Sequence, residues 1–242
     1  MMLVDSHTHL YDMKKGYELP SDIFPVVVGY SHTSNHKALE CARAGGYPFV
    51  LGIAPQTTVK EGVGKIDEWV SFIGESRPNA IGEAGLDYKW AQNAKQVENE
   101  KLAFSRMIEL ANELGLPLVV HSRDNPNDNG LPKDAIGDIL GMTGKTKLLM
   151  HFFSGNAEQA GRIVEMGGYI SVAHIRSKER RKVINIVPLD RLLVESDSPY
   201  IGRTPESVRE AIAYIAEVKG ITPMDVAKAT TKNAMGFFGF RL

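Results

Sequence analysis

Four histidines and two carboxylates stand after short apolar runs of this sequence, where β-strands are expected to end. Imidazole nitrogen and carboxylate oxygen are ligands for divalent metal ions. A thiolate site is excluded, because Cys41 is the only cysteine. The sequence therefore predicts one metal site, built from His7, His9, Glu83, His121, His151 and Asp197.

The spacing of His7 and His9 favours a shared ion. Residues two apart in a strand point to the same face, so both imidazoles can reach one metal, at about 2.0–2.1 Å if it is zinc. The same alternation places Asp5 behind His7 and Glu195 behind Asp197. We expect these two carboxylates to hydrogen-bond ligand imidazoles and so to fix their tautomers.

The elements that position these residues alternate along the chain. Eight apolar runs have the length of buried strands, and helical patterns lie between them. The clearest helix is expected from Gln96 to Leu114, and others begin near His36, Gly64, Asp134, Asn156, Ser177, Thr204 and Thr222. The expected strands are Leu3–Ser6, Pro25–Gly29, Pro48–Ile53, Ala80–Glu83, Pro117–His121, Lys147–His151, Tyr169–Val172 and Arg191–Glu195.

Nearly continuous apolar strands, each followed by a helix, predict a parallel sheet covered on both sides. Eight such units close into a (β/α)8 TIM barrel, so we expect an α/β fold with one domain over residues 1–242. An open doubly wound sheet would usually carry a glycine-rich turn where this sequence has His7-Thr8-His9. In a barrel the carboxyl ends of the strands meet at one mouth, which would bring the six residues together.

The composition limits location and partners. A formal net charge of −1 over 242 residues gives no general attraction for nucleic acid, so any polyanion has to bind locally. No stretch is long and apolar enough to span a bilayer, and the start of the chain lacks the basic leader of a secretion signal. We expect a soluble, cytoplasmic protein without membrane contact and without an obligate protein partner.

Five blocks of the sequence resemble those of one family, the TatD-family metal-dependent hydrolases. The blocks occur in the family's order and extend over nearly the whole chain, so together they are specific. They are HTHL from His7, GEAGLDY from Gly82, PLVVHSR from Pro117, HFFSG from His151 and PLDRLLVESDSPY from Pro188.

This resemblance implies a barrel of the amidohydrolase superfamily with a two-metal centre. It implies that one ion is bound by His7, His9, Glu83 and Asp197, and the other by Glu83, His121 and His151, with Glu83 bridging. The metal identity stays open among Zn²⁺, Mg²⁺ and Mn²⁺. The segment after Tyr200 is shorter than is usual in the family, so a substrate preference transfers less securely than the metal ligands.

Two divalent cations, two carboxylates and four neutral imidazoles leave a net charge of about +2, which favours an anionic substrate. In such a centre a metal-activated water is the nucleophile, Asp197 orients it and receives its proton, and Glu83 holds the two ions together. Arg123 lies two residues after His121, and we expect its guanidinium to bind a phosphate oxygen. A salt bridge at the rim is the alternative for Arg123.

The pattern therefore predicts a phosphodiesterase, namely a deoxyribonuclease that acts on DNA ends or short single strands. A hydrolase of small amides, lactones or acyl esters is the alternative, since the same scaffold hosts those reactions. A nucleic-acid-binding protein with a vestigial metal site is a third reading, disfavoured because no ligand position is missing. Three features are candidate contacts to nucleic acid: Tyr88, Trp90 and the basic run 176–182. The alternative for the two aromatic residues is packing on the barrel, and the alternative for the basic run is a solvated helix face.

Overall fold

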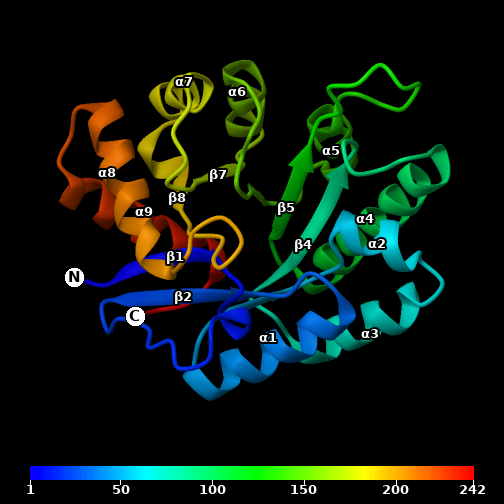
Figure 1. The fold of residues 1–242 in the computed structure, drawn as a ribbon, viewed down its shortest axis with the longest axis horizontal. Helices are drawn as coiled ribbons and strands as arrows, with labels where there is room; N and C mark the ends of the chain where they lie inside the picture. The colour runs from blue at the N-terminus through cyan, green and yellow to red at the C-terminus, as the bar shows by residue number, and fades with distance from the viewer.

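Eight parallel strands form one sheet in the computed structural model, which describes residues 1–242 (Figure 1). Each strand pairs with the next along the chain, as a barrel requires. The predicted (β/α)8 barrel is confirmed, with every expected strand present. The strands are β1 Leu3–Thr8, β2 Ile23–Val28, β3 Phe49–Leu51, β4 Ala80–Asp87, β5 Leu118–Arg123, β6 Leu148–Met150, β7 Tyr169–Val172 and β8 Leu192–Val194.

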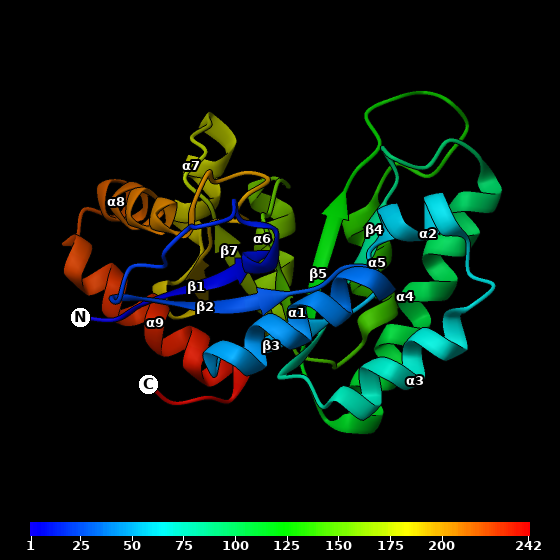
Figure 2. The ribbon, with the colours of Figure 1, turned by 60° about the horizontal axis from the view of Figure 1, so that its bottom comes forward.

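Helices cover the outside of the barrel. Figure 2 shows α3 and α4 on one flank and α8 and α9 on the other, with both ends of the chain near α9. None of the helices has the length and apolar character needed to cross a membrane. They are α1 His32–Gly45, α2 Pro55–Glu61, α3 Ile66–Ser76, α4 Ala94–Leu114, α5 Ala135–Thr143, α6 Ala157–Glu165, α7 Lys178–Ile186, α8 Val208–Lys219 and α9 Pro223–Phe238, with 3-10 turns at Leu10–Asp12, Leu189–Arg191 and Pro205–Ser207.

Two helices differ from expectation. Helix α1 begins at His32, earlier than predicted, because the Ser31 hydroxyl accepts a hydrogen bond from the Ser34 amide and caps this turn. Helix α2 is not predicted by the sequence at all. Its seven residues are too few to display an apolar period of three and four.

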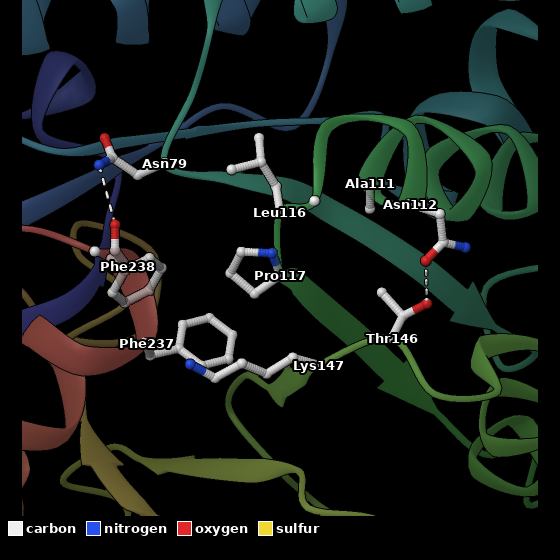
Figure 3. A pocket seen from close by; sticks show the side chains of 11 residues that line it. Asn79, Ala111, Asn112, Leu116, Pro117, Thr146, Lys147, Phe237 and Phe238 are labelled. Carbon is white, nitrogen blue, oxygen red and sulfur yellow. Dashed lines mark hydrogen bonds between the residues drawn. The ribbon is translucent and has the colours of Figure 1, made fainter.

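The interior of the barrel is apolar toward the amino ends of the strands. Val4, Val119 and Leu193 each precede a site residue on their strand, and Phe237 and Phe238 of α9 pack against the same cluster. Helix α9 therefore plugs this end of the barrel. A pocket of about 420 Å³ lies beside the plug and is bordered by Phe237 and Phe238 (Figure 3).

The barrel closes between β1 and the residues that follow β8. The amide of Asp197 donates to the carbonyl of His7 at 2.9 Å, and the amide of His9 donates to the carbonyl of Ser198 at 2.8 Å. The Asp5 carboxylate accepts hydrogen bonds from the amide of Ser196 at 2.9 Å and from its hydroxyl at 2.5 Å. The seam is thus made largely by the segments that carry the predicted site residues.

Strand β4 extends beyond its predicted end at Glu83 to Asp87. Gly82 and Gly85 both have left-handed φ values, and a Cβ atom on either would collide with β5, at the carbonyl of Val119 or of His121. Glycine at these positions therefore lets β4 and β5 approach closely on both sides of Glu83. As a result, Asp87 pairs with Arg123 across the two strands.

Candidate metal centre

The six predicted residues meet at the carboxyl end of the barrel, and Glu83 lies at their centre. One or the other of its oxygens lies within 3.5 Å of a ring nitrogen of His7, of His121 and of His151. Asp197 lies 3.3 Å from Nε2 of His9 and 3.9 Å from Nε2 of His7. The barrel thus brings all six residues together from the ends of five strands, as we expected from their positions in the sequence.

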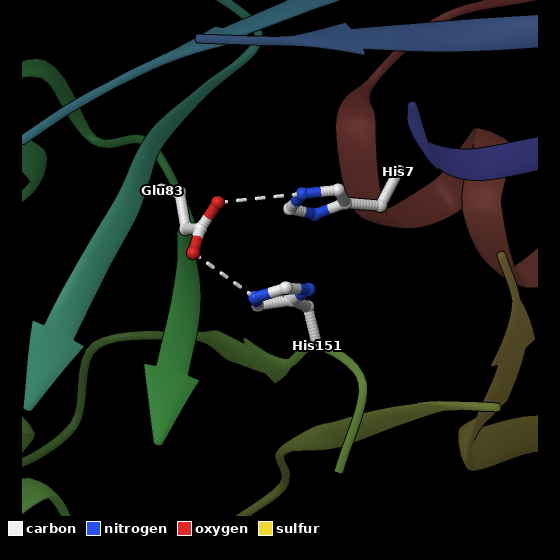
Figure 4. Close-up of side chains that lie close together, drawn as sticks. All are labelled: His7, Glu83 and His151. Atoms are coloured by element: carbon white, nitrogen blue, oxygen red, sulfur yellow. Dashed lines mark ion pairs between the residues drawn. The ribbon is translucent and has the colours of Figure 1, made fainter. Parts of the chain in front are cut away.

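His7 and His151 lie next to each other and both face Glu83 from the same side (Figure 4). The Oε2 atom of Glu83 is 3.5 Å from Nε2 of His7, and its Oε1 atom is 3.3 Å from Nε2 of His151. The two rings are stacked with their centroids 4.0 Å apart. No nitrogen of either ring has a hydrogen-bond partner, although all are buried. Burying such atoms unpaired is costly, which fits a bound metal ion that accepts a lone pair from each ring.

His9 is oriented by the backbone of the neighbouring strand. Its Nδ1 atom lies 2.8 Å from the carbonyl oxygen of Val28, which can only accept a hydrogen bond. The proton is therefore on Nδ1, and the lone pair of Nε2 points toward Asp197. Asp197 itself has a φ of 48°, a left-handed conformation that aspartate adopts more readily than most residues.

His121 is held by two residues that the sequence did not single out, Asp87 and Gln56. Its Nδ1 atom lies 3.1 Å from Oε1 of Glu83, while its Nε2 atom lies 2.9 Å from Oδ2 of Asp87. The Gln56 amide donates to the same oxygen of Asp87 at 2.9 Å. Asp87 thus favours the tautomer that leaves Nδ1 free to bind a cation.

Glu100 of α4 supports Asp87 from behind. Its carboxylate accepts a hydrogen bond from the Asp87 amide at 2.9 Å, and the residue is completely buried. Burial raises the pKa of Glu100 to about 8, although the amide of Asp87 opposes this shift. Asp87 lies an even number of positions after Glu83, so in a continuous strand both side chains point to the same face. This spacing could have identified Asp87, but the two glycines of β4 obscured the strand pattern.

The two carboxylates predicted to orient imidazoles lie in different surroundings. Glu195 places Oε1 at 3.7 Å from Nδ1 of His151, while its other oxygen accepts a hydrogen bond from the Ser171 hydroxyl at 2.5 Å. Asp5 accepts instead from Ser196 and from the amide of His7, and bonds no imidazole. The expectation for Asp5 is therefore corrected. Its carboxylate is occupied by the amide and the hydroxyl of Ser196, so Asp5 stabilises the seam of the barrel.

The electrostatics of the cluster favour a bound cation. Burial by itself would raise the pKa of Glu83, but the imidazoles of His151, His121 and His7 outweigh burial and hold this pKa well below its usual value. Burial likewise opposes charge on His151, yet the carboxylates of Glu83 and Glu195 raise its pKa well above the ordinary value. A buried carboxylate that stays ionised attracts positive charge.

The donor set fits a divalent metal. His7, Glu83 and His151 offer donor atoms within 4.8 Å of one another, and so do His7, His9 and Asp197. All are nitrogen or oxygen donors, which suits zinc and related ions, and magnesium where water completes the shell. The buried ring nitrogens of His7 and His151, which have no hydrogen-bond partner, supply an independent reason for a bound metal ion beside Glu83.

A pocket of about 320 Å³ opens over this cluster, a size within the range of small-ligand sites. Arg123 lies on its wall, with Nε 3.8 Å from Oδ2 of Asp87, and two-fifths of its side chain is exposed. Tyr30 and Tyr200 form the opposite rim and join their hydroxyls at 3.0 Å. No pattern in the sequence marks these two tyrosines as site residues.

The remaining candidate contacts have structural partners. Tyr88 is fully buried and donates a hydrogen bond to Asp138 at 2.6 Å, so it cannot stack on a base. Arg176 and Arg181 of the basic run both pair with Glu217, at 2.6 and 2.8 Å, which agrees with a solvated helix face. Trp90 is exposed beside the ammonium of Lys60.

A parallel eight-stranded barrel with buried imidazoles and carboxylates at its mouth defines a class, the metal-dependent hydrolases built on the TIM barrel. Within this class the chain belongs to the TatD-related DNase family, whose model matches residues 4–239. The resemblance inferred from the motifs is therefore confirmed.

Individual relatives agree with this membership. The chain is 30% identical to the uncharacterized metal-dependent hydrolase YabD of Bacillus subtilis, over 98% of this chain and 99% of that protein. It is 31% identical to the deoxyribonuclease TATDN3 of Homo sapiens, over 89% of this chain and 79% of that protein. The solved structure of YjjV, a TatD homologue of Escherichia coli, shares the fold with a TM-score of 0.80 at 22% identity, covering 99% of this chain and 98% of its own.

Proposed function

We propose that this protein hydrolyses phosphodiester bonds in DNA, at strand ends or in short single strands, with two divalent metal ions. The ions we propose are Zn²⁺, Mg²⁺ or Mn²⁺, held by His7, His9, Glu83 and Asp197 on one side and by Glu83, His121 and His151 on the other. The single cysteine, Cys41, suits a reducing compartment, and we propose the cytoplasm.

The observation that carries this proposal is the set of buried, unpaired imidazole nitrogens around Glu83 beneath an open pocket. The pocket wall adds the guanidinium of Arg123, which suits a phosphate oxygen better than a neutral ester. The name of the human relative, a deoxyribonuclease, supports DNA as the substrate.

Divalent metal ions, when bound, supply positive charge for phosphoryl oxygens and lower the pKa of a bound water. Asp197 is placed to orient the attacking water and to accept its proton, since it borders the pocket beside His9. Glu83 spans both groups of donors. Asp87 would hold His121 in the tautomer that presents the Nδ1 lone pair to the cluster. The charge of Glu195, whose Oε1 atom lies 3.7 Å from Nδ1 of His151, would favour a proton on that nitrogen.

The experiment that tests this function reconstitutes metal-stripped protein with each candidate ion in turn. Activity is measured on a 3′-recessed duplex, a single-stranded oligonucleotide, bis(p-nitrophenyl) phosphate and the neutral ester p-nitrophenyl acetate. We expect turnover of the phosphodiesters that depends on the metal. Turnover of the neutral ester without any phosphodiester cleavage would replace the proposal by the alternative, a hydrolase of amides, lactones or acyl esters.

Arg123→Ala tests the role of the guanidinium. We expect KM for a phosphodiester to rise about tenfold or more, because a charge-assisted hydrogen bond is lost. The bound metal, measured by mass spectrometry, should stay at the wild-type level, since no ligand atom is removed. An unaltered KM would show that Arg123 is only a rim salt bridge to Asp87.

A further inference from the structure

A second pocket lies beside the first at the mouth of the barrel. It has a volume of about 360 Å³ and is lined by polar residues of three loops and by the end of β5, including Lys89, Arg123, Asp124, Asn125, Ser154 and Gly155. Arg123 lines both pockets, so the two are neighbours that share one wall. A ligand held over the metal cluster that extends past Arg123 enters this second pocket.

The second pocket carries positive charge that the protein itself does not neutralise. Lys89 is exposed and takes part in no ion pair. Arg123 has its nearest carboxylate oxygen at 3.8 Å, and that oxygen of Asp87 is already engaged by His121 and Gln56. Both cations are therefore available to an anion from outside.

The single carboxylate of this pocket, Asp124, is occupied. Its Oδ1 atom accepts hydrogen bonds from the amides of Ala135 and Ile136, at 2.8 and 3.3 Å, at the start of α5. Its Oδ2 atom accepts from the side-chain amide of Gln159 at 3.0 Å. Asp124 thus satisfies the helix start, and the amide donors and the positive end of the α5 dipole offset part of its charge.

The loop after β6 adds backbone donors. A Cβ atom on Gly155 would come within 2.7 Å of the side-chain ends of Phe153, Gln159 and Ile136, so the loop packs tightly here. No backbone carbonyl accepts from the amides of Ser154 and Gly155. The pocket is thus lined by two cations and by a loop whose amides make no backbone hydrogen bond, a composition that suits a tetrahedral oxyanion.

We propose that this second pocket binds the phosphate next to the one being hydrolysed, so that the preferred substrate carries at least two phosphodiester groups on one strand. This inference rests on the proposed function, since it assumes a phosphodiester over the metal cluster. It makes Lys89 a substrate-binding residue and gives Arg123 a position between two successive phosphates.

The test compares Lys89→Ala and Lys89→Glu with wild type on a short single-stranded oligonucleotide and on bis(p-nitrophenyl) phosphate, which has a single diester. We expect the ratio of kcat/KM for the oligonucleotide to that for the single diester to fall about tenfold in Lys89→Ala, and further in Lys89→Glu. The matched control is Lys145→Ala, which removes the same charge from the loop before β6, at the opposite end of the barrel. This control should keep the wild-type ratio.

A binding measurement separates the subsite from catalysis. In an Asp197→Asn background, anisotropy of a labelled oligonucleotide should show weaker binding for Lys89→Ala, with the slope of log Kd against log salt reduced by about 0.7, the contribution of one phosphate contact to a single strand. A tenfold lower ratio and a reduced slope support the second phosphate site. Equal losses on both substrates, or an unchanged slope, overturn it. If wild type cleaves no phosphodiester with any metal, the proposed function fails, and the salt slope still decides whether Lys89 binds phosphate.

Discussion

The two ends of the barrel each have a pocket of similar size, about 420 Å³ at the amino end and about 320 Å³ at the carboxyl end. At the amino end the polar groups already have partners. The Asn79 side chain donates to the carbonyl of Phe238 at 3.1 Å, and Thr146 donates to Asn112 at 2.8 Å (Figure 3). Lys147 donates to the carbonyl of Gly236 at 3.0 Å. At the carboxyl end, both nitrogens of His7 and of His151 have none.

Volume therefore does not distinguish the two pockets. They differ in whether their polar atoms have hydrogen-bond partners. The polar groups of the amino end fasten α9 to the barrel and contribute to stability. At the carboxyl end, the ring nitrogens of His7 and His151 are buried without hydrogen-bond partners, at a cost that a bound ion would offset. If this contrast is correct, substitutions at one end should alter chemistry and substitutions at the other should alter the free energy of unfolding.

The largest effect is expected for Glu83→Gln. Loss of this carboxylate removes the charge that faces three imidazoles, so kcat should fall by about 10³, or ~4 kcal/mol of transition-state stabilisation. Metal content should fall as well, as measured by mass spectrometry. Glu113→Gln, on the exposed end of α4, is the control. Wild-type metal content and rate in Glu83→Gln would remove Glu83 from the centre.

Phe237→Ala tests the plug. Phe237 is 3% exposed and packs against Phe238 and Tyr169, so its loss should cost about 3 kcal/mol of unfolding free energy. Thermal denaturation should show Tm lower by roughly 10 °C. Below Tm the variant should keep its metal and its kcat. A fall in kcat at 25 °C without a shift in Tm would contradict the division between the two ends.

Asp87→Asn comes next, because it acts on the centre only through His121. An amide can donate as well as accept a hydrogen bond and no longer fixes the tautomer of the ring. Metal affinity or activity should fall about 10- to 100-fold. Competition with a chelator measures the affinity, and Asp190→Asn on an exposed turn is the control. Equal chelator competition in Asp87→Asn and wild type would show that Asp87 does not position His121.

The smallest effect is expected for Asn79→Ala. The change removes hydrogen bonds to the Phe238 carbonyl and the Phe49 amide, which should cost about 1 kcal/mol. Tm should fall by roughly 2–4 °C, with kcat unaffected. Asn112→Ala, on the exposed side of the same pocket, should shift Tm less. A change in kcat or KM would mean that the amino-end pocket communicates with the mouth.

The six central residues were predictable because each stands at the end of an apolar strand, and closing a barrel brings strand ends together. Asp87 and Glu100 were not predictable in the same way. The predicted strand ends at Glu83, and only the pairing with β5 shows that the strand continues to Asp87. Gln56 lies on a helix too short to leave a pattern, and the role of Asp5 depended on which neighbour its carboxylate would meet.

The seam between β1 and the segment after β8 has a consequence for biosynthesis. His7 is synthesised well before Asp197, and their backbones are joined by a hydrogen bond only when the barrel closes. An unfinished or truncated chain therefore has neither the closing strand nor the full set of donors. Hydrolytic capacity would appear late and all at once, after the last strand docks, and a partly made chain would carry no active centre.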